Sequence, residues 1–237
     1  MRWWDDQRLA EPVPGFGELG LTAFTTTRHA GSFSLNSAEP SATAFGRWLA
    51  LGTALAPLSP RLAFAHQVHG TEVVEHHPAW RGLLQVPRAD GHLAVTGATG
   101  MAVTLADCVP VYFGHRSGVA GVLHSGWRGT AAGITRVAIA LFEQAKIPAA
   151  ELHVHCGPAI CGRCYQVSPE VYRALTGRAV GGPTPVDLRD LIAESARAAG
   201  VRQVTISSAC TRCHNDRYYS HRCGDAGRQV GVIVTGR

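Results

Sequence analysis

Residues 101–130 read MAVTLADCVPVYFGHRSGVAGVLHSGWRGT, and they hold two apolar runs that each end in polar residues. The first run, near 101–106, ends at Asp107-Cys108, and the second, near 118–124, leads into His124-Ser-Gly-Trp-Arg-Gly-Thr130. Apolar runs of this length that are rich in β-branched residues predict buried strands. Because functional groups collect in the turns that follow such strands, we look for the site at these two strand ends.

The residues outward from this stretch predict a mixture of strands and helices. Apolar residues 134, 137, 138, 141 and 142 recur at helical spacing and predict a helix over 130–145. Ser168-Pro169 and Asp187 have the residue types of helix starts, and Gly200 marks a helix end. Further strands are predicted near 21–27, 62–66, 71–76, 151–156, 203–207 and 229–235. The pattern predicts an α/β (α+β) fold: a single layered domain over residues 1–237, with a mixed central sheet flanked by helices.

Composition excludes several classes of protein. Of the 237 residues, 46% are hydrophobic and 16% charged, which argues against disorder, and no apolar run reaches the ~20 residues of a membrane span. The first residues lack the apolar core of a secretory signal, so we expect a cytoplasmic protein without a membrane partner. The net charge is +5, but the basic residues are scattered singly and all but Lys146 are arginine. Dispersed arginines favour small anionic substrates over nucleic acid.

Three residues at strand ends form a possible metal site. His69, Cys108 and His124 each lie beside glycine or proline. Two imidazoles and a thiolate suit Zn²⁺, and three protein ligands leave a fourth position for water or substrate. Since their spacing matches no short ligand motif, three unrelated turn residues remain the alternative.

The same atoms also allow a different chemistry. Cys108 could act as a nucleophile with His124 as its base, and Asp107 could then orient the imidazole. Such a protein would be a cysteine hydrolase acting on an amide or a peptidoglycan-related substrate. The metal content of the protein would separate the two hypotheses.

A second group of residues has the character of an anion site. The glycine-rich turn before the 130–145 helix contains Arg128, Gly129 and Thr130, and a helix start offers free N–H groups to a phosphate. Arg28 and Asn36 belong to another polar cluster that follows a predicted strand. The alternative is a plain turn in which Arg128 pairs with a surface acid.

Only one of the seven cysteines belongs to the candidate site, and an odd number of cysteines argues against a framework of disulfides. Cys161-Gly-Arg-Cys164 and Cys210-Thr-Arg-Cys213 are separated by far more than the 15–20 residues of a zinc ribbon, so partly buried thiols are predicted there. A second, structural zinc site is the alternative, and a content of about two zinc ions per chain would favour it. His153-Val-His155 has the spacing of copper-oxidase ligands, but the other histidines are dispersed. We therefore interpret this pair as residues of a strand face and do not predict laccase chemistry.

The order of the motifs along the chain resembles one bacterial family. It is the laccase-domain or multicopper-polyphenol-oxidase-like family, whose members are regarded as zinc-dependent purine nucleoside phosphorylases. The stretches that match are Phe24-Thr-Thr-Thr-Arg28, Ser34-Leu-Asn36, Gln67-Val-His-Gly70, Ala89-Asp-Gly91, Ala106-Asp-Cys-Val-Pro-Val111, His124-Ser-Gly-Trp-Arg-Gly129, Gly157-Pro-Ala-Ile160, Cys164-Tyr-Gln-Val167, Cys210-Thr211 and Arg217-Tyr-Tyr-Ser-His-Arg222. They span nearly the whole chain.

The resemblance implies both a reaction and a ligand set. The family's zinc ligands correspond to His69, Cys108 and His124. The implied activities are phosphorolysis of adenosine, inosine, guanosine and methylthioadenosine, and deamination of adenosine. Purine nucleosides and inorganic phosphate are then the expected partners, with phosphate held by Arg28 and the 126–130 turn. The resemblance also implies a layered fold likened to that of deamidating bacterial toxins.

Overall fold

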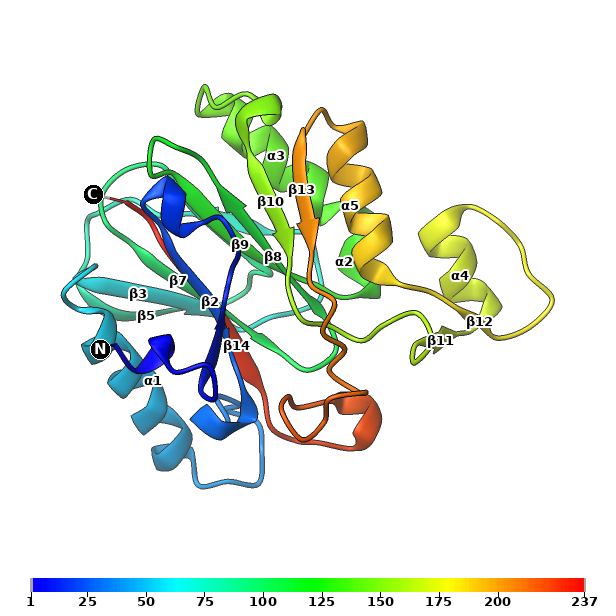
Figure 1. The fold of residues 1–237 in the computed structure, drawn as a ribbon, viewed down its shortest axis with the longest axis horizontal. Helices are drawn as coiled ribbons and strands as arrows, with labels where there is room; N and C mark the ends of the chain where they lie inside the picture. Colours follow the sequence, from blue (N-terminus) through cyan, green and yellow to red (C-terminus); the bar gives the residue numbers. More distant parts are fainter. Residues whose placement is uncertain (1, 237) are drawn as a thin grey trace.

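The computed structural model describes residues 2–236 and contains two six-stranded mixed sheets (Figure 1). The first sheet has the order β1 (Ala10–Pro12), β2 (Thr22–Thr26), β14 (Gln229–Val234), β7 (Gly100–Leu105), β3 (Arg61–Ala65), β5 (Gly82–Val86). The second has the order β13 (Gln203–Ile206), β10 (His153–Cys156), β8 (Val109–Gly114), β9 (Ala120–Ser125), β6 (Gly91–Ala94), β4 (Val73–Glu75). A two-stranded sheet pairs β11 (Gln166–Val167) with β12 (Thr184–Pro185).

The two large sheets pack face to face, and helices cover their outer faces, as Figure 1 shows. Helix α1 (Ser41–Leu55) packs on the first sheet, whereas α3 (Ile134–Gln144) and α5 (Leu188–Ala198) pack on the second. Successive side chains along each strand point to opposite faces of its sheet. Met101 and Val103 of β7 therefore pack with Val122 of β9 between the sheets, while Ala102 faces α1. We interpret this shared core as that of one domain.

The α/β class predicted from the sequence is confirmed, but two sheets replace the expected central one. Strands such as β7, β8 and β14 are buried on both faces because one face meets the other sheet and the other face meets helices. A buried strand between two helical layers would show the same continuous apolar run. The sequence therefore could not reveal how many sheets share the strands.

The helices follow their local signals with one interruption. The helix predicted over 130–145 is divided into α2 (Trp127–Ala132) and α3 by Gly133, which adopts the left-handed conformation with φ +84°. Helix α4 (Pro169–Thr176) begins with proline, and the Asp187 side chain caps α5 by accepting from the Arg189 N–H, as predicted. Helix α1 and the strands β5, β6 and β8 were not predicted. The short 3₁₀ helices are η1 (Trp3–Asp5), η2 (Gly17–Leu19), η3 (Arg28–Ala30), η4 (Ala149–Glu151) and η5 (His221–Cys223).

The chain crosses from the first sheet to the second three times, between β3 and β4, β5 and β6, and β7 and β8. These crossovers carry His69, Asp90 and Cys108 respectively. His124 lies at the end of β9, opposite Pro110 at the start of β8, and Leu123 pairs with Gly91 at the start of β6. All four residues therefore lie at the same end of the paired sheets. Within residues 2–236, the helices are too short or too polar to span a bilayer.

Candidate functional site

The three predicted metal ligands converge at this end of the sheets. The nearest ligand atoms of His69, Cys108 and His124 all lie within 4.8 Å of one another. The two imidazole rings meet edge to face, with centroids 4.7 Å apart and planes at 83°. His124 is buried, Cys108 is half-buried and His69 is exposed, so the cluster is reached from one side.

One buried carboxylate organises the cluster. Asp90 is 0% exposed and accepts hydrogen bonds from the backbone N–H groups of Val68, His69 and Gly70 at 3.2, 2.9 and 2.7 Å. It also accepts from Nδ1 of His124 at 2.9 Å. A carboxylate that binds one histidine nitrogen fixes the tautomer and leaves Nε2 for a metal or a substrate. Asp90 thus fixes the His69 loop and the His124 ring together.

Asp107 does not orient His124, and that expectation is wrong. Its carboxylate accepts hydrogen bonds from Oγ1 of Thr211 at 2.6 Å and from the Arg222 N–H at 2.8 Å. Asp107 therefore ties the Cys108 turn to the loop that precedes β14. Asp90 takes the role instead; it belongs to the Ala89-Asp-Gly91 stretch that matches the family, but the sequence assigned it no role.

The backbone is strained at two residues of the site. His69 and Asp107 have φ values of +59° and +78°, and among residues 2–236 only one other non-glycine residue, Lys146, has a positive φ. Such conformations persist where surrounding bonds enforce them, and they concentrate at functional sites. Here the Asp90 bonds enforce the His69 turn. The Gln67 side chain supports it by bonding the backbone N–H and C=O of Thr104 at 2.7 and 2.9 Å.

The cluster stabilises charge on the sulfur. Burial alone would raise the pKa of the Cys108 thiol, but the charge of His124 and hydrogen bonds from both histidines lower it to about 6. Burial would likewise lower the pKa of His124, but the Cys108 thiolate and Asp90 raise it to about 9. Each group thus favours the charged form of the other, which stabilises a thiolate on Cys108 beside a protonated His124.

The donor set fits a metal of intermediate softness. It offers one sulfur that ionises readily and two imidazoles, one of them held by a carboxylate on its far nitrogen. A metal held by these three groups would keep a position open and act as a Lewis acid.

Two cavities meet at the cluster, and both are lined by His69, Ala106, Cys108 and His221. The larger has a volume of about 700 Å³ and is walled by apolar and amide side chains, among them Leu35, Asn36, Phe64, Gln67 and Gln85. The smaller, of about 300 Å³, is lined by Asp107, Trp127, Arg128, Tyr165 and Arg222. Volumes of this order suit a small organic ligand beside a small anion.

The residues predicted to bind an anion do not all line the same cavity. Asn36 lines the larger cavity and Arg128 the smaller, where the Arg128 guanidinium lies over the Trp127 ring at 4.4 Å. Within the described chain, no carboxylate lies in ion-pair distance of Arg128, which disfavours the surface-pair alternative. Arg28 lines neither cavity and is instead paired with Asp225 at 3.0 Å.

Gly129 and Thr130 make structural contacts in this turn, and their predicted role in phosphate binding stays a prediction. Neither lines either cavity. A Cβ on Gly129 would lie 2.9 Å from the Gly70 carbonyl, so the glycine permits the turn to pack on the His69 loop. The Thr130 hydroxyl donates to the Gly126 carbonyl at 2.9 Å and contacts Ser125, which holds the first turn of α2.

We expect Gly126→Ala to disturb the cluster without unfolding the protein. A Cβ at this position would lie 2.9 Å from Cys108 Sγ and 3.3 Å from His69 Cδ2, so both side chains must move. Metal affinity should fall by about tenfold or more, since displacement of ligand groups has such costs. Metal titration with circular dichroism of the folded protein measures this effect. Gly46→Ala, whose Cβ would meet open space in α1, is the control and should bind metal normally.

The fold and the site together define a class: layered α/β proteins with a His-Cys-His cluster where the chain crosses between two sheets. A family model described as multi-copper polyphenol oxidoreductase laccase matches residues 40–236, and the chain belongs to this family.

Similar proteins support the same assignment. A purine nucleoside phosphorylase of Streptomyces coelicolor is 32% identical over 182 residues, covering 73% of this chain and 74% of that protein. The purine nucleoside phosphorylase YlmD of Geobacillus stearothermophilus is 31% identical over 209 residues, covering 78% and 74%. The crystal structure of YlmD superposes with a TM-score of 0.85 at 29% identity, covering 95% of this chain and 94% of YlmD. The Bacillus licheniformis protein YfiH shares the fold, with a TM-score of 0.83 at 22% identity and 98% of each chain covered.

The family's description mentions copper, but the His153-Val-His155 pair does not belong to a ligand cluster. His155 is buried in β10, where Nδ1 contacts Oγ1 of Thr205 at 2.8 Å. Residues 2–236 contain two clusters of three or more metal-ligating side chains, and neither includes this pair.

Proposed function

We propose that this protein is a zinc-dependent purine nucleoside phosphorylase that accepts adenosine, inosine, guanosine and methylthioadenosine, and that it also deaminates adenosine. The observation that carries the proposal is the position of the His69, Cys108 and His124 cluster at the junction of two cavities. Relatives at about 30% identity that bear the name purine nucleoside phosphorylase support it. The relatives belong to a nucleoside-processing class, and the choice of substrates, zinc and deamination are our inference.

The two cavities suit the two substrates of phosphorolysis. The larger has apolar walls for a purine and amide groups, from Asn36 and Gln85, for hydrogen bonds. The smaller brings the guanidinium groups of Arg128 and Arg222 close to Cys108, which favours inorganic phosphate there. This arrangement would hold the phosphate and the nucleoside on the two sides of the cluster.

In phosphorolysis the protein mainly positions the two substrates, because no covalent bond to the protein is formed. A phosphate oxygen attacks C1′ of the ribose, the C1′–N9 bond breaks, and the purine leaves with the bonding electron pair and takes up a proton. The products are ribose 1-phosphate and the free base. Holding both substrates in one orientation contributes much of the rate, and a bound metal would add Lewis acidity. Deamination would use the larger cavity, with water replacing the amino group of adenosine and ammonia leaving.

The test is an assay of the purified protein on inosine with and without phosphate. Hypoxanthine and ribose 1-phosphate should form in equal amounts, and only when phosphate is present. Adenosine without phosphate should give inosine and ammonia. Absence of phosphate-dependent hypoxanthine release, from protein shown to be folded and metal-loaded, would overturn the phosphorylase proposal.

A second function has a specific observation in its favour. Cys108, His124 and Asp90 are arranged as a nucleophile, a base and an orienting acid, with the Cys108 pKa lowered to about 6. This arrangement supports a cysteine hydrolase acting on an amide or a peptidoglycan-related substrate. Chelation separates the two functions: the hydrolase keeps full activity without metal, whereas the phosphorylase loses it.

We expect Arg128→Gln to weaken phosphate binding in particular. A guanidinium bound to phosphate contributes about 1.5–3 kcal/mol through charged hydrogen bonds, so the KM for phosphate should rise about 10- to 100-fold. The KM for inosine should change little, because the purine lies in the other cavity. Initial rates at varied phosphate and inosine concentrations measure this. Arg136→Gln, which removes an arginine of α3 that lines neither cavity, is the control; equal changes in both KM values for Arg128→Gln would contradict the proposed phosphate site.

A further inference from the structure

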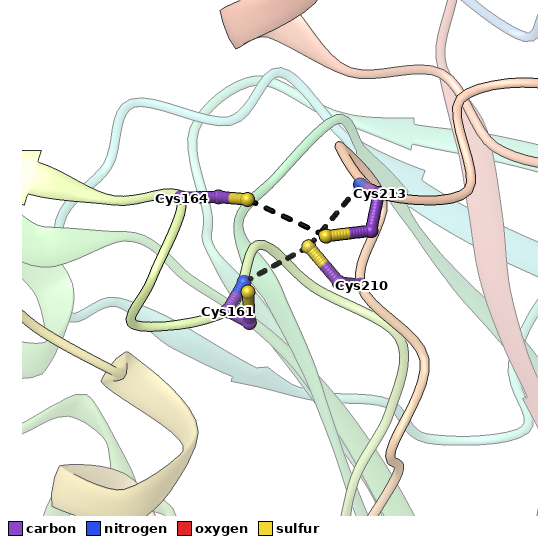
Figure 2. Close-up of side chains that lie close together, drawn as sticks. All are labelled: Cys161, Cys164, Cys210 and Cys213. Carbon is purple, nitrogen blue, oxygen red and sulfur yellow. Dashed lines mark hydrogen bonds between the residues drawn. The ribbon is translucent and has the colours of Figure 1, made fainter.

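Four cysteines outside the candidate active site lie together where two loops meet (Figure 2). Cys161 and Cys164 follow β10, and Cys210 and Cys213 follow β13. The partners Cys161 and Cys210 are 49 positions apart in sequence. Strands β10 and β13 are parallel neighbours, so their following loops leave the sheet at the same end. The wide spacing that argued against a zinc ribbon is therefore bridged by strand pairing.

The four sulfurs have the separations of a tetrahedral metal site. All four Sγ atoms lie within 4.8 Å of one another, and the Cys164 and Cys213 sulfurs are 3.5 Å apart. Four sulfurs at the Zn–S distance of about 2.3 Å from one ion would be separated by about 3.8 Å. A disulfide needs about 2.05 Å between sulfurs, and none of the four is bonded in this way.

Each pair also occupies a tight turn with amides directed at sulfur. The Cys164 N–H donates to the Cys161 carbonyl at 2.9 Å, which closes the first turn. The backbone N–H groups of Cys161 and Cys213 donate to Cys210 Sγ at 3.2 and 3.4 Å. Amide donors to sulfur stabilise a thiolate, which is the form that binds a metal. As Figure 2 shows, the two loops present their sulfurs to one another across a small gap.

Three arginines lie next to this cluster in sequence or in space. Arg163 and Arg212 each lie inside one of the Cys-x-x-Cys turns, and Arg212 donates to the Cys164 carbonyl at 3.4 Å. The buried Arg189 donates to the carbonyls of Ser207 and Ala209, the latter immediately before Cys210. A divalent ion with four thiolates carries a net charge of −2, which Arg163 and Arg212 offset in part, whereas Arg189 is already paired with Asp187 at 2.7 Å.

We propose that Cys161, Cys164, Cys210 and Cys213 bind one Zn²⁺ ion in a closed, structural site that is distinct from the His69–Cys108–His124 cluster. Binding converts four thiols to thiolates and releases their protons to solvent. With four protein ligands, no position remains for substrate, so the ion holds structure.

Such a site would stabilise two loops that lie next to the smaller cavity. Tyr165, which lines that cavity, directly follows Cys164. Thr211, between Cys210 and Cys213, donates to Asp107 beside Cys108. The ion would hold these two loops together while contacting neither substrate.

The test counts zinc and identifies its ligands in the full-length protein, purified under reducing conditions and replete with zinc. The wild type should contain two zinc ions per chain, and Cys108→Ala should contain one. X-ray absorption of zinc in Cys108→Ala should then show four sulfur neighbours at about 2.3 Å. Cys164→Ser in the wild-type background should lose one equivalent while keeping the His69-site ion. Cys223→Ser, an exposed cysteine outside the cluster, is the matched control and should keep both ions.

Three outcomes would overturn this site. The first is wild-type protein with one zinc ion and four thiols in the cluster that react with a thiol reagent. The second is a pair of disulfides found by mass spectrometry of unreduced protein. The third is a zinc spectrum in Cys108→Ala with nitrogen neighbours. Each measurement can be made on wild type or Cys108→Ala, so failure of a cluster variant to fold does not leave the question open. None depends on the nucleoside activity.

Discussion

Asp90→Asn should lower activity by about 10- to 100-fold and the free energy of unfolding by about 1–3 kcal/mol. The carboxylate accepts from three backbone N–H groups and from His124, whereas an amide offers one oxygen and places an NH₂ group against donors. The loss of charge also removes the group that holds the His124 tautomer. Inosine phosphorolysis, metal titration and urea unfolding measure the three consequences.

The Asp90 result has a matched control and a clear contrary outcome. Asp190→Asn changes the same group at an exposed position in the first turn of α5; it should leave activity unchanged and lower the free energy of unfolding by no more than about 0.3–1 kcal/mol. Since both the His69 loop and the His124 ring depend on Asp90, metal affinity and activity should fall together. A variant that is destabilised but binds metal with wild-type affinity would show that Asp90 supports the fold alone.

Cys108→Ala should reduce phosphorolysis by about three orders of magnitude and remove one metal equivalent. A metal that stabilises transition-state charge contributes several kcal/mol, and each 1.36 kcal/mol is a tenfold change in rate. The substitution leaves a small space at the start of β8, next to the intact Asp107 bonds to Thr211 and Arg222. The fold should therefore persist. Phosphorolysis rates and metal content per chain are the measurements.

The same variant distinguishes a ligand from a nucleophile. If Cys108 is a metal ligand, activity and one metal equivalent are lost together, and chelation of the wild type has the same effect. If Cys108 is a nucleophile, alkylation abolishes activity while metal-free wild type remains fully active. Cys223→Ala, which alters an exposed cysteine that lines neither cavity, should behave as wild type in both measurements.

The sequence predicted those helix starts that depend on interactions between residues close together in the chain. The start of α5 at Asp187 and the proline start of α4 follow from hydrogen-bonding rules that act over a few residues. Helix α1 was missed although its buried residues, Ala44, Trp48, Leu51 and Leu55, recur at helical spacing. The number of sheets could not be predicted, because it depends on which strands pair across long separations.

The candidate site likewise contains residues that the sequence could predict and residues that it could not. The positions of His69, Cys108 and His124 at strand ends suggested a metal site, the family resemblance selected it over unrelated turn residues, and the structure brings the three together. Asp90 was not assigned a role, since its importance arises from four partners that only tertiary structure supplies. The convergence of the two Cys-x-x-Cys pairs depends on the parallel pairing of β10 and β13, which sequence spacing does not encode.

The three crossovers between the sheets also determine how the site responds to motion. His69, Asp90 and Cys108 each lie where the chain passes from one sheet to the other, so both ends of each of these segments are anchored in a sheet, and we expect the ligands to stay together while both sheets are folded. Local fluctuations of single loops then leave the cluster intact, and its loss coincides with cooperative unfolding of the whole domain. In native-state hydrogen exchange, the Val68, His69 and Gly70 amides that donate to Asp90 should accordingly exchange with the slow rates of the intersheet core rather than with those of surface loops.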